Sequence, residues 1–446
     1  MKKFNYSFPV FFCLSSLMVI YNSCKINSSK HSYAYDAILI HNANQNLTNC
    51  MVEDLLTPPF ASRVYAYSHV AMYEALRPAY PQYEDLKGVL NGFDSIPQCD
   101  TTKSINYEIA AITAFNNVAQ KLVWSEHIIE EWQTKYVDSL KKAGLNEAVI
   151  QNSIDWARQV SGAVLMWAKN DNFKATRKMT RYSLADTAGA WQLTPPAYAQ
   201  PVEPYWGLIR PFLIDSPQQF SQQVPVAFNK AINSNYYKAV LEVYDISQKL
   251  TPEQINIAVF WDDNPNVAHL NGHVAYFAQK MTPGGHWLAI TGGILKSRNS
   301  NAMQTSQTYT YASLVLADAF ITCWHYKYKF NTVRPITVIN EMKDPKWFSY
   351  IQTPPFPEYP SGHSTISGAV STLLTNLLGD SIAFTDSSEL AYDLPVRSFK
   401  SFIDAANEVN ISRVYGGIHY RFTCDSSLVL GREIGNYYIE KLGIEK

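Results

Sequence analysis

Residues 360–379 read PSGHSTISGAVSTLLTNLLG, and this stretch predicts an amphipathic helix that stops at Gly379. Apolar residues recur three and four positions apart and so share one helix face: Ile366, Ala369, Val370, Leu373, Leu374, Leu377 and Leu378. The first turn carries Ser361, Gly362 and His363 instead. First-turn N–H groups have no partner within the helix and lie at the positive end of its dipole. The stretch therefore predicts an anion site, although Ser361 fits an ordinary N-cap equally well.

Two further helical patterns each place a cation where an apolar residue is expected. The face that continues to Lys327 consists of Leu316, Phe320 and Cys323. The face that continues to Arg413 consists of Phe402 and Ala406. An unpaired buried charge costs several kcal/mol, so each cation needs a partner. Taken singly, each fits better as a residue near a helix end that reaches water along its own stem.

Taken together, the motifs form one constellation. In order they are Lys327-x6-Arg334-Pro335, then Pro360-Ser361-Gly362-His363, then Ser412-Arg413-x5-His419. One lysine, two arginines, a hydroxyl and backbone N–H groups suit a tetrahedral, multiply charged oxyanion. The two histidines add a nucleophile or ligand and an acid/base, which a simple anion sink would not need.

This constellation resembles the superfamily that joins vanadium-dependent haloperoxidases to type 2 phosphatidic acid phosphatases and bacterial acid phosphatases. The resemblance implies that the equatorial oxygens of vanadate or phosphate are held by Lys327, Arg334, Ser361, Gly362 and Arg413. It implies that His419 is the apical vanadium ligand, or the nucleophile that becomes phosphohistidine in a phosphatase. His363 would be the general acid/base.

The chain departs from the family pattern beside His419. Many members carry an aspartate four residues after the apical histidine, where it orients the ring. Here that position is Thr423, and the nearest acid is Asp425. The orienting partner of His419 is therefore open. An acid from the Asp262–Asp263 pair is a possible partner for one site arginine.

Two aromatic residues bear on the choice of reaction. Trp324 and Phe356 occupy positions at which chloroperoxidases of this family carry the Trp and Phe that line the halide site. The alternative is that both are core aromatics beside a Pro-rich loop. The long helical N-terminal half also favours a haloperoxidase over the shorter acid phosphatases.

Periodicity along the chain predicts an all-α fold. The resemblance implies helical bundles of the vanadium chloroperoxidase and acid phosphatase type. We divide the chain into a signal peptide with a lipobox over residues 1–24, an N-terminal helical region over 25–226 and a C-terminal helical catalytic domain over 227–446. The N-terminal region ends in a long Pro- and aromatic-rich loop, expected to be packed and functional. A net charge of −1 gives no basic footprint for nucleic acid.

The first residues predict export. Lys2 and Lys3 precede an apolar run over residues 8–21 that is too short for a membrane span, and Asn22-Ser23-Cys24 is similar to a relaxed bacterial lipobox. We expect Cys24 to be acylated and to hold the protein in the bacterial cell envelope, at the outer membrane, as its sole membrane contact. The alternative is an ordinary signal peptide cleaved nearby.

Four cysteines remain in the mature chain, and they allow three pairings. Because Cys323 lies on the Lys327 face and Cys424 follows His419 by five residues, we predict that these two lie near each other. A bridge between them is one of the pairings that the sequence leaves open.

Three functions remain open. The favoured one is a haloperoxidase that uses vanadate as cofactor and acts on halide and hydrogen peroxide. The second is a phosphatase that needs no metal cofactor and hydrolyses phosphomonoesters through phosphohistidine. The third is a non-catalytic lipoprotein that binds an oxyanion.

Overall fold

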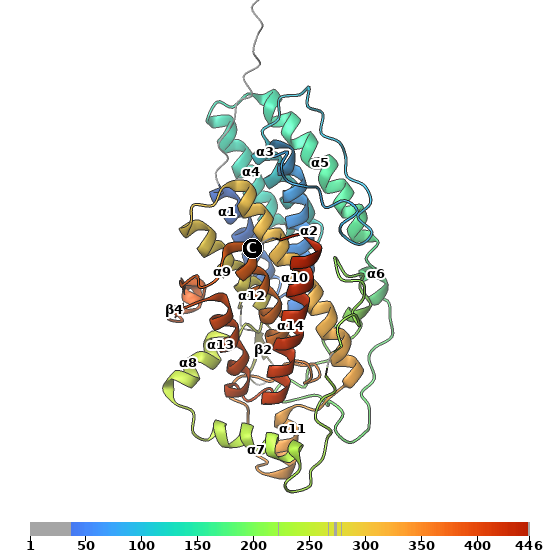
Figure 1. The fold of residues 1–446 in the computed structure, drawn as a ribbon, viewed down its shortest axis with the longest axis vertical. Coiled ribbons are helices and arrows are strands. Elements are labelled where there is room, and N and C mark those ends of the chain that lie inside the picture. Colours follow the sequence, from blue (N-terminus) through green and yellow to red (C-terminus); the bar gives the residue numbers. More distant parts are fainter. Residues whose placement is uncertain (1–36, 222, 266, 272–273, 278, 445–446) are drawn as a thin grey trace, which may run out of the picture. The chain divides into compact units, whose positions relative to one another are not determined.

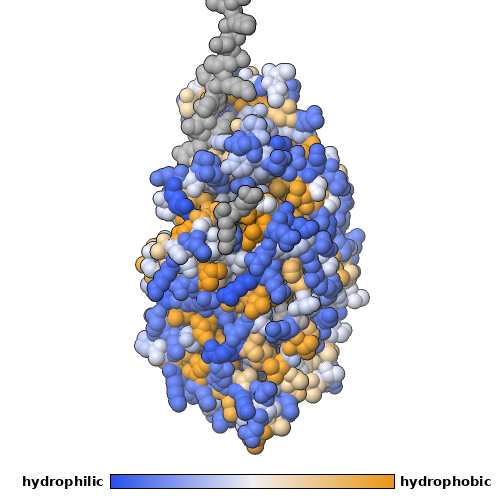
Figure 2. Space-filling view, viewed as in Figure 1, coloured by the Kyte–Doolittle hydropathy of each residue, from blue (hydrophilic) through white to orange (hydrophobic). Residues whose placement is uncertain are grey.

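The computed structural model describes residues 37–444 except 222, 266, 272–273 and 278. The described residues belong to one compact unit, Tyr35–Lys446. The proposed lipid-attachment residue Cys24 lies outside the described residues. Within them, no helix combines the length and the hydropathy that a membrane crossing requires. On the face shown in Figure 2, hydrophilic residues predominate and apolar ones lie in small separate groups.

The first half of the compact unit is helical (Figure 1). Its elements are α1 Ile38–Glu53, α2 Pro58–Leu76, η1 Arg77–Ala79, α3 Tyr107–Gln120, α4 Glu126–Lys142, α5 Glu147–Lys169, α6 Phe173–Thr176 and η2 Trp206–Leu208. Helix α2 is buried along its whole length and packs against α3, α5 and α10. It starts at Pro58, where the fixed φ of proline suits a first helical position.

The second half adds more helices and two small antiparallel ribbons. Its helices are α7 Asn235–Ser247, α8 Pro252–Phe260, α9 Pro283–Ser297, α10 Ala302–Phe330, α11 Pro335–Met342, α12 Gly362–Leu378, η3 Ser388–Tyr392, α13 Phe402–Tyr415 and α14 Arg421–Lys441. Its strands are β1 Ala268–Asn271, β2 Val274–Phe277, β3 Phe384–Asp386 and β4 Arg397–Phe399, with β1 paired to β2 and β3 to β4. The all-α prediction is confirmed, but the sequence pattern did not reveal the two ribbons, because strands of three or four residues are too short to show a period.

Helix α12 lies at the centre of the site-bearing half and packs against α10, α13 and α14 (Figure 1). This is the helix predicted from residues 360–379, with Ser361 as its N-cap and Gly379 as its C-cap. Its contact with α14 depends on glycine: a Cβ on Gly431 would lie 2.0 Å from the carbonyl oxygen of Thr365. Helix α14 begins at Arg421, two residues after His419.

The long Pro- and aromatic-rich loop packs against α10. The buried carboxylate of Asp318 accepts the backbone N–H groups of Phe212, Leu213 and Ile214, at 2.6 to 3.1 Å, and the Tyr438 hydroxyl at 2.6 Å. Burial raises the pKa of Asp318, and these four donors oppose that rise. One carboxylate therefore ties the loop to both α10 and α14.

We predict that Gly431→Ala destabilises the protein because its methyl group cannot fit against the α12 backbone. Forced overpacking costs about 1–3 kcal/mol, so the thermal or urea midpoint should fall. Gly162→Ala is the matched control: it lies in α5 with nothing within 4 Å of the added Cβ, and alanine favours helix. An unchanged midpoint for Gly431→Ala would contradict the close packing.

Candidate active site

The first turn of α12 combines a capping hydroxyl with a buried glycine. The Ser361 hydroxyl accepts the Ser364 N–H at 3.3 Å, so the N-cap interpretation is correct, while its own proton remains free to be donated. Gly362 follows as the first helical residue, and a Cβ there would lie 3.3 Å from the Trp324 ring. Glycine at this position therefore lets the Trp324 ring pack close to the first turn.

Lys327 joins the end of α10 to the loop that precedes α12. Its ammonium is fully buried and donates to the carbonyls of Pro357 at 2.9 Å, Glu358 at 3.1 Å and Pro360. Burial, with a smaller contribution from the charge of the neighbouring Arg334, lowers the pKa of Lys327 to about 7. An anion bound beside Lys327 would favour the charged ammonium form of this side chain.

Arg334, the N-cap residue of α11, is fully buried. Its Nε donates to the Phe356 carbonyl at 3.0 Å, and Nη1 donates to the Ile418 carbonyl at 2.9 Å and lies 3.2 Å from His419 Nε2. The remaining nitrogen, Nη2, is buried without a hydrogen-bond partner among the described residues. Burial lowers the pKa of Arg334 to about 10, so the group stays charged at neutral pH.

The third cation, Arg413, comes from α13. Its Nη2 donates to the Trp261 carbonyl at 2.5 Å, and Nη1 lies 3.5 Å from His363 Nε2. Burial lowers the pKa of Arg413, while Asp262 and Asp263 raise it. The structure thus places the Asp262–Asp263 pair beside one arginine, as the sequence suggested, although neither forms an ion pair with it among the contacts of the described residues.

His419 is held by an acid that sequence reasoning missed. Its Nδ1 lies 2.8 Å from the Glu358 carboxylate, whose other oxygen accepts the Thr423 hydroxyl at 3.0 Å. Because a carboxylate only accepts, we infer that Nδ1 carries the proton and that Nε2 presents its lone pair to the site. Burial, helped by Arg334, lowers the pKa of His419 well below its usual range and keeps the ring neutral.

Glu358 therefore takes the place of the aspartate that the family pattern puts after the apical histidine. The nearest acid in sequence, Asp425, accepts instead from Asn410 at 2.9 Å. Glu358 is the one charged residue in the stretch IQTPPFPEYP over residues 351–360. A lone acid in a buried Pro-rich loop was the available signal, because such a charge requires a partner.

His363 lies at the open side of the site. Its side chain is 16% exposed, against 3% for His419, and its Nε2 lies 3.9 Å from an oxygen of Asp263. Burial lowers the pKa of His363 well below its usual range, and the charge of Arg413 adds to this effect. The ring is therefore neutral and able to accept a proton at neutral pH.

Trp324 and Phe356 lie together beside the cations. Their ring centroids are 5.0 Å apart, and the Lys327 ammonium lies 5.0 Å from the Phe356 ring and 5.7 Å from the Trp324 ring. Trp324 also donates to the Val202 carbonyl at 3.2 Å, so the long loop fixes its indole. Trp324 and Phe356 therefore pack in the hydrophobic core and also border the site.

Cys323 and Cys424 form no bridge: Cys50, Cys99, Cys323 and Cys424, the cysteines among the described residues, are all free thiols. Cys323 and Cys424 are both buried and both act on the charge of Lys327, so they border the site as expected. Each has its own neighbour instead, because Cys323 Sγ lies 3.7 Å from the Pro360 carbonyl and Cys424 interacts with the Ser364 hydroxyl.

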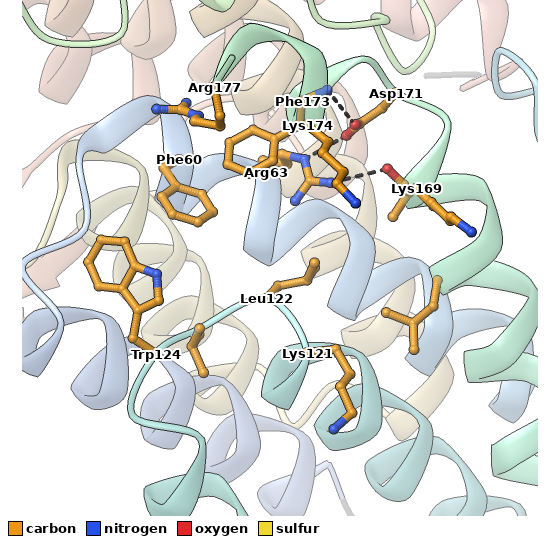
Figure 3. A pocket seen from close by; sticks show the side chains of 13 residues that line it. Phe60, Arg63, Lys121, Leu122, Trp124, Lys169, Asp171, Phe173, Lys174 and Arg177 are labelled. Carbon is orange, nitrogen blue, oxygen red and sulfur yellow. Dashed lines mark hydrogen bonds and ion pairs between the residues drawn. The ribbon is translucent and has the colours of Figure 1, made fainter.

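A separate cavity of about 430 Å³ lies among α2, α5 and α6 (Figure 3). Its main cations already have partners: Arg63 pairs with Asp171 at 2.6 Å, and Arg177 pairs with Glu203. None of the seven residues of the oxyanion constellation lines this cavity. The convergence of cations and histidines described above, rather than this cavity, marks the candidate active site.

Comparisons with known proteins identify the family of this chain. The family model described as the VCPO second helical-bundle domain matches residues 307–443. A solved structure described as the first bacterial vanadium-dependent iodoperoxidase is 41% identical, with a TM-score of 0.86 over 91% of this chain and 96% of that one. A holo-type bacterial vanadium-dependent chloroperoxidase is 17% identical, with a TM-score of 0.67 over 87% of this chain and 93% of that one, and shares the fold. No curated protein matches at the sequence level. The identity and coverage of the iodoperoxidase match, on a chain whose oxyanion motifs converge in space, establish that this protein belongs to the vanadium-dependent haloperoxidase family of enzymes.

Proposed function

We propose that this enzyme holds vanadate between its three buried cations and the first turn of α12, and that it oxidises halide with hydrogen peroxide. The observation that carries the proposal is the buried, unpartnered Nη2 of Arg334, on the guanidinium whose Nη1 lies 3.2 Å from His419 Nε2. A buried N–H group without an acceptor costs about 1–3 kcal/mol. An oxyanion oxygen at this point would satisfy it.

The donor set fits vanadate chemically. Two guanidinium groups offer forked N–H donors, Lys327 offers a point charge, and the first turn of α12 offers backbone N–H groups and the Ser361 hydroxyl. His419 Nε2, held by Glu358 behind the ring, would supply the apical nitrogen. Bound vanadate would contribute a Lewis-acidic centre that activates hydrogen peroxide.

The protein's own part in the reaction is proton transfer and the control of water. His363 is neutral and partly exposed, so its ring nitrogen can take a proton from incoming hydrogen peroxide and return it later. The Trp324 and Phe356 rings cover the Lys327 side of the site, which suits a weakly hydrated halide better than water.

Iodide is the halide that we propose as substrate. Phe356 resembles a chloroperoxidase feature, but the more similar relative, at 41% identity, is described as an iodoperoxidase, while the chloroperoxidase is only 17% identical. Phosphatase activity is measured only as a control for this proposal.

We also propose that acylated Cys24 anchors the enzyme in the cell envelope, which metabolic labelling with palmitate and a Cys24→Ser variant would test.

The direct test is reconstitution. The purified protein, stripped and reloaded with orthovanadate, should oxidise iodide with hydrogen peroxide and should not hydrolyse a chromogenic phosphomonoester. His419→Ala should lose both vanadate binding and turnover. His363→Ala should keep vanadate, with turnover reduced about 10²- to 10⁴-fold.

The control variant is His127→Ala, which alters an exposed histidine of α4 and should behave as the parent protein does.

Because the pKa of His363 is depressed, the acid limb of the pH–rate profile should lie below pH 6.5 and should vanish in His363→Ala. Phosphatase activity without peroxidase activity would reject the proposal.

Glu358 gives a second prediction. Glu358→Gln keeps the shape of the side chain but removes the charge that holds the His419 Nδ1–H, so the affinity for vanadate should fall about 10- to 100-fold. The control is Asp425→Asn, which alters the nearest acid in sequence and should leave the affinity unchanged. Equilibrium dialysis with vanadate measures both variants. The reverse ranking would mean that Asp425 orients the ring.

A further inference from the structure

A second group of buried polar side chains lies behind His363. His286 of α9 is fully buried, and its two ring nitrogens face two carboxylates: Nδ1 lies 2.9 Å from Asp263 Oδ1, and Nε2 lies 2.8 Å from Asp386 Oδ2. Asp386 is further held by the N–H and hydroxyl of Ser388. None of these contacts belongs to the oxyanion site, although Asp263 borders it.

A third carboxyl group, that of Glu389, completes this cluster. Oε1 of Glu389 lies 3.7 Å from His286 Nδ1, is buried, and has no hydrogen-bond partner among the described residues. Lys280, the nearest lysine that acts on Glu389, lies 3.9 Å from Asp262 instead. Three buried carboxyl groups around one imidazole are unfavourable unless a cation or added protons balance them.

The geometry suits a cation. His286 Nδ1 and one oxygen each of Asp263 and Glu389 all lie within 4.8 Å of one another. Metal–nitrogen and metal–oxygen bonds of about 2.0–2.2 Å place neighbouring ligand atoms roughly 3–4 Å apart. Asp386 on Nε2 would fix the tautomer that frees Nδ1, which is the usual carboxylate–histidine–metal arrangement.

We propose that Asp263, His286 and Glu389 bind one divalent first-row metal ion, of which Zn²⁺ is the representative. One imidazole and two carboxylates are ligands that zinc and manganese accept, whereas calcium and magnesium prefer an all-oxygen set. Binding displaces the protons that Nδ1 and Glu389 would otherwise hold. The inference does not depend on whether the oxyanion site holds vanadate.

The metal site would act on the reaction through Asp263. One oxygen of this carboxylate faces His286, and the other lies 3.9 Å from His363 Nε2. An ion bound to the first oxygen would fix the second against His363. Asp263 would then be a positioning residue for the acid/base.

The rival is a proton-balanced cluster with no ion. In that case His286 is an imidazolium between Asp263 and Asp386, stacked 4.6 Å from the Trp261 ring, and Glu389 carries a proton. One substitution distinguishes the metal-bound cluster from the proton-balanced cluster. Glu389→Gln is isosteric with a protonated glutamate. The substitution therefore removes a metal ligand but leaves the shape and the charge of the proton-balanced cluster unchanged.

The experiment uses the full mature protein, treated with a chelator, dialysed against Zn²⁺ and then against metal-free buffer. We expect about one equivalent of zinc by plasma mass spectrometry and a raised melting temperature relative to the chelated protein. Glu389→Gln should fold but lose both the zinc and the zinc-dependent shift. Glu253→Gln, which alters an exposed carboxylate paired with Arg397, should retain both.

His286→Asn is the second variant and should also lose the zinc. Three results would overturn the proposal: no retained zinc in the parent, zinc retained equally by Glu389→Gln, or ¹⁵N spectra of the zinc-treated parent that show both His286 ring nitrogens protonated. These readouts do not use peroxidase activity. A failure of the vanadate proposal therefore leaves this test unaffected.

Discussion

The contact of Lys327 with three carbonyls of the loop before α12 is the interaction on which the site depends. It fixes the end of α10 against the beginning of α12, and the same loop carries Phe356 and Glu358. A buried ammonium without acceptors would be costly, so these carbonyls stabilise Lys327. The contact therefore holds the loop in place, and the loop carries the Phe356 ring and Glu358, the partner of His419.

The second constraint is charge balance. Lys327, Arg334 and Arg413 are all buried, and the acids near them are already engaged, Glu358 with His419 and Asp263 with His286. Burial raises the pKa of Glu358 to about 7, and Arg334 and Lys327 oppose that rise. Such a site is costly when empty and gains stability from a multiply charged anion. Folding and anion binding thus favour each other.

The sequence predicted much of this arrangement because helical spacing maps directly onto helix faces. Lys327, Ser361 and Arg413 could be assigned to three helices, and Gly379 to the end of one, from local patterns alone. Long-range partners could not be predicted in this way. Glu358 was missed because the family pattern directed attention to the residues after His419, and the sequence left a Cys323–Cys424 bridge open because spacing along two helices does not fix the direction of two Sγ atoms.

The surroundings of His286 show most clearly that long-range partners cannot be predicted from sequence spacing. Its neighbours Asp263, Asp386 and Glu389 come from a loop, a strand end and a short 3₁₀ helix, all of them far from His286 in sequence. No periodic pattern joins such positions. Only the packing of α9 against β3 and η3 brings them together.

The crystal structure of the vanadate-soaked protein would test the central claim most directly. The account predicts an oxyanion bonded to Nε2 of His419, with Arg334 Nη2 as a donor and the Glu358 carboxylate still on Nδ1. An anion bound elsewhere, or one that leaves Arg334 Nη2 without an acceptor, would contradict it.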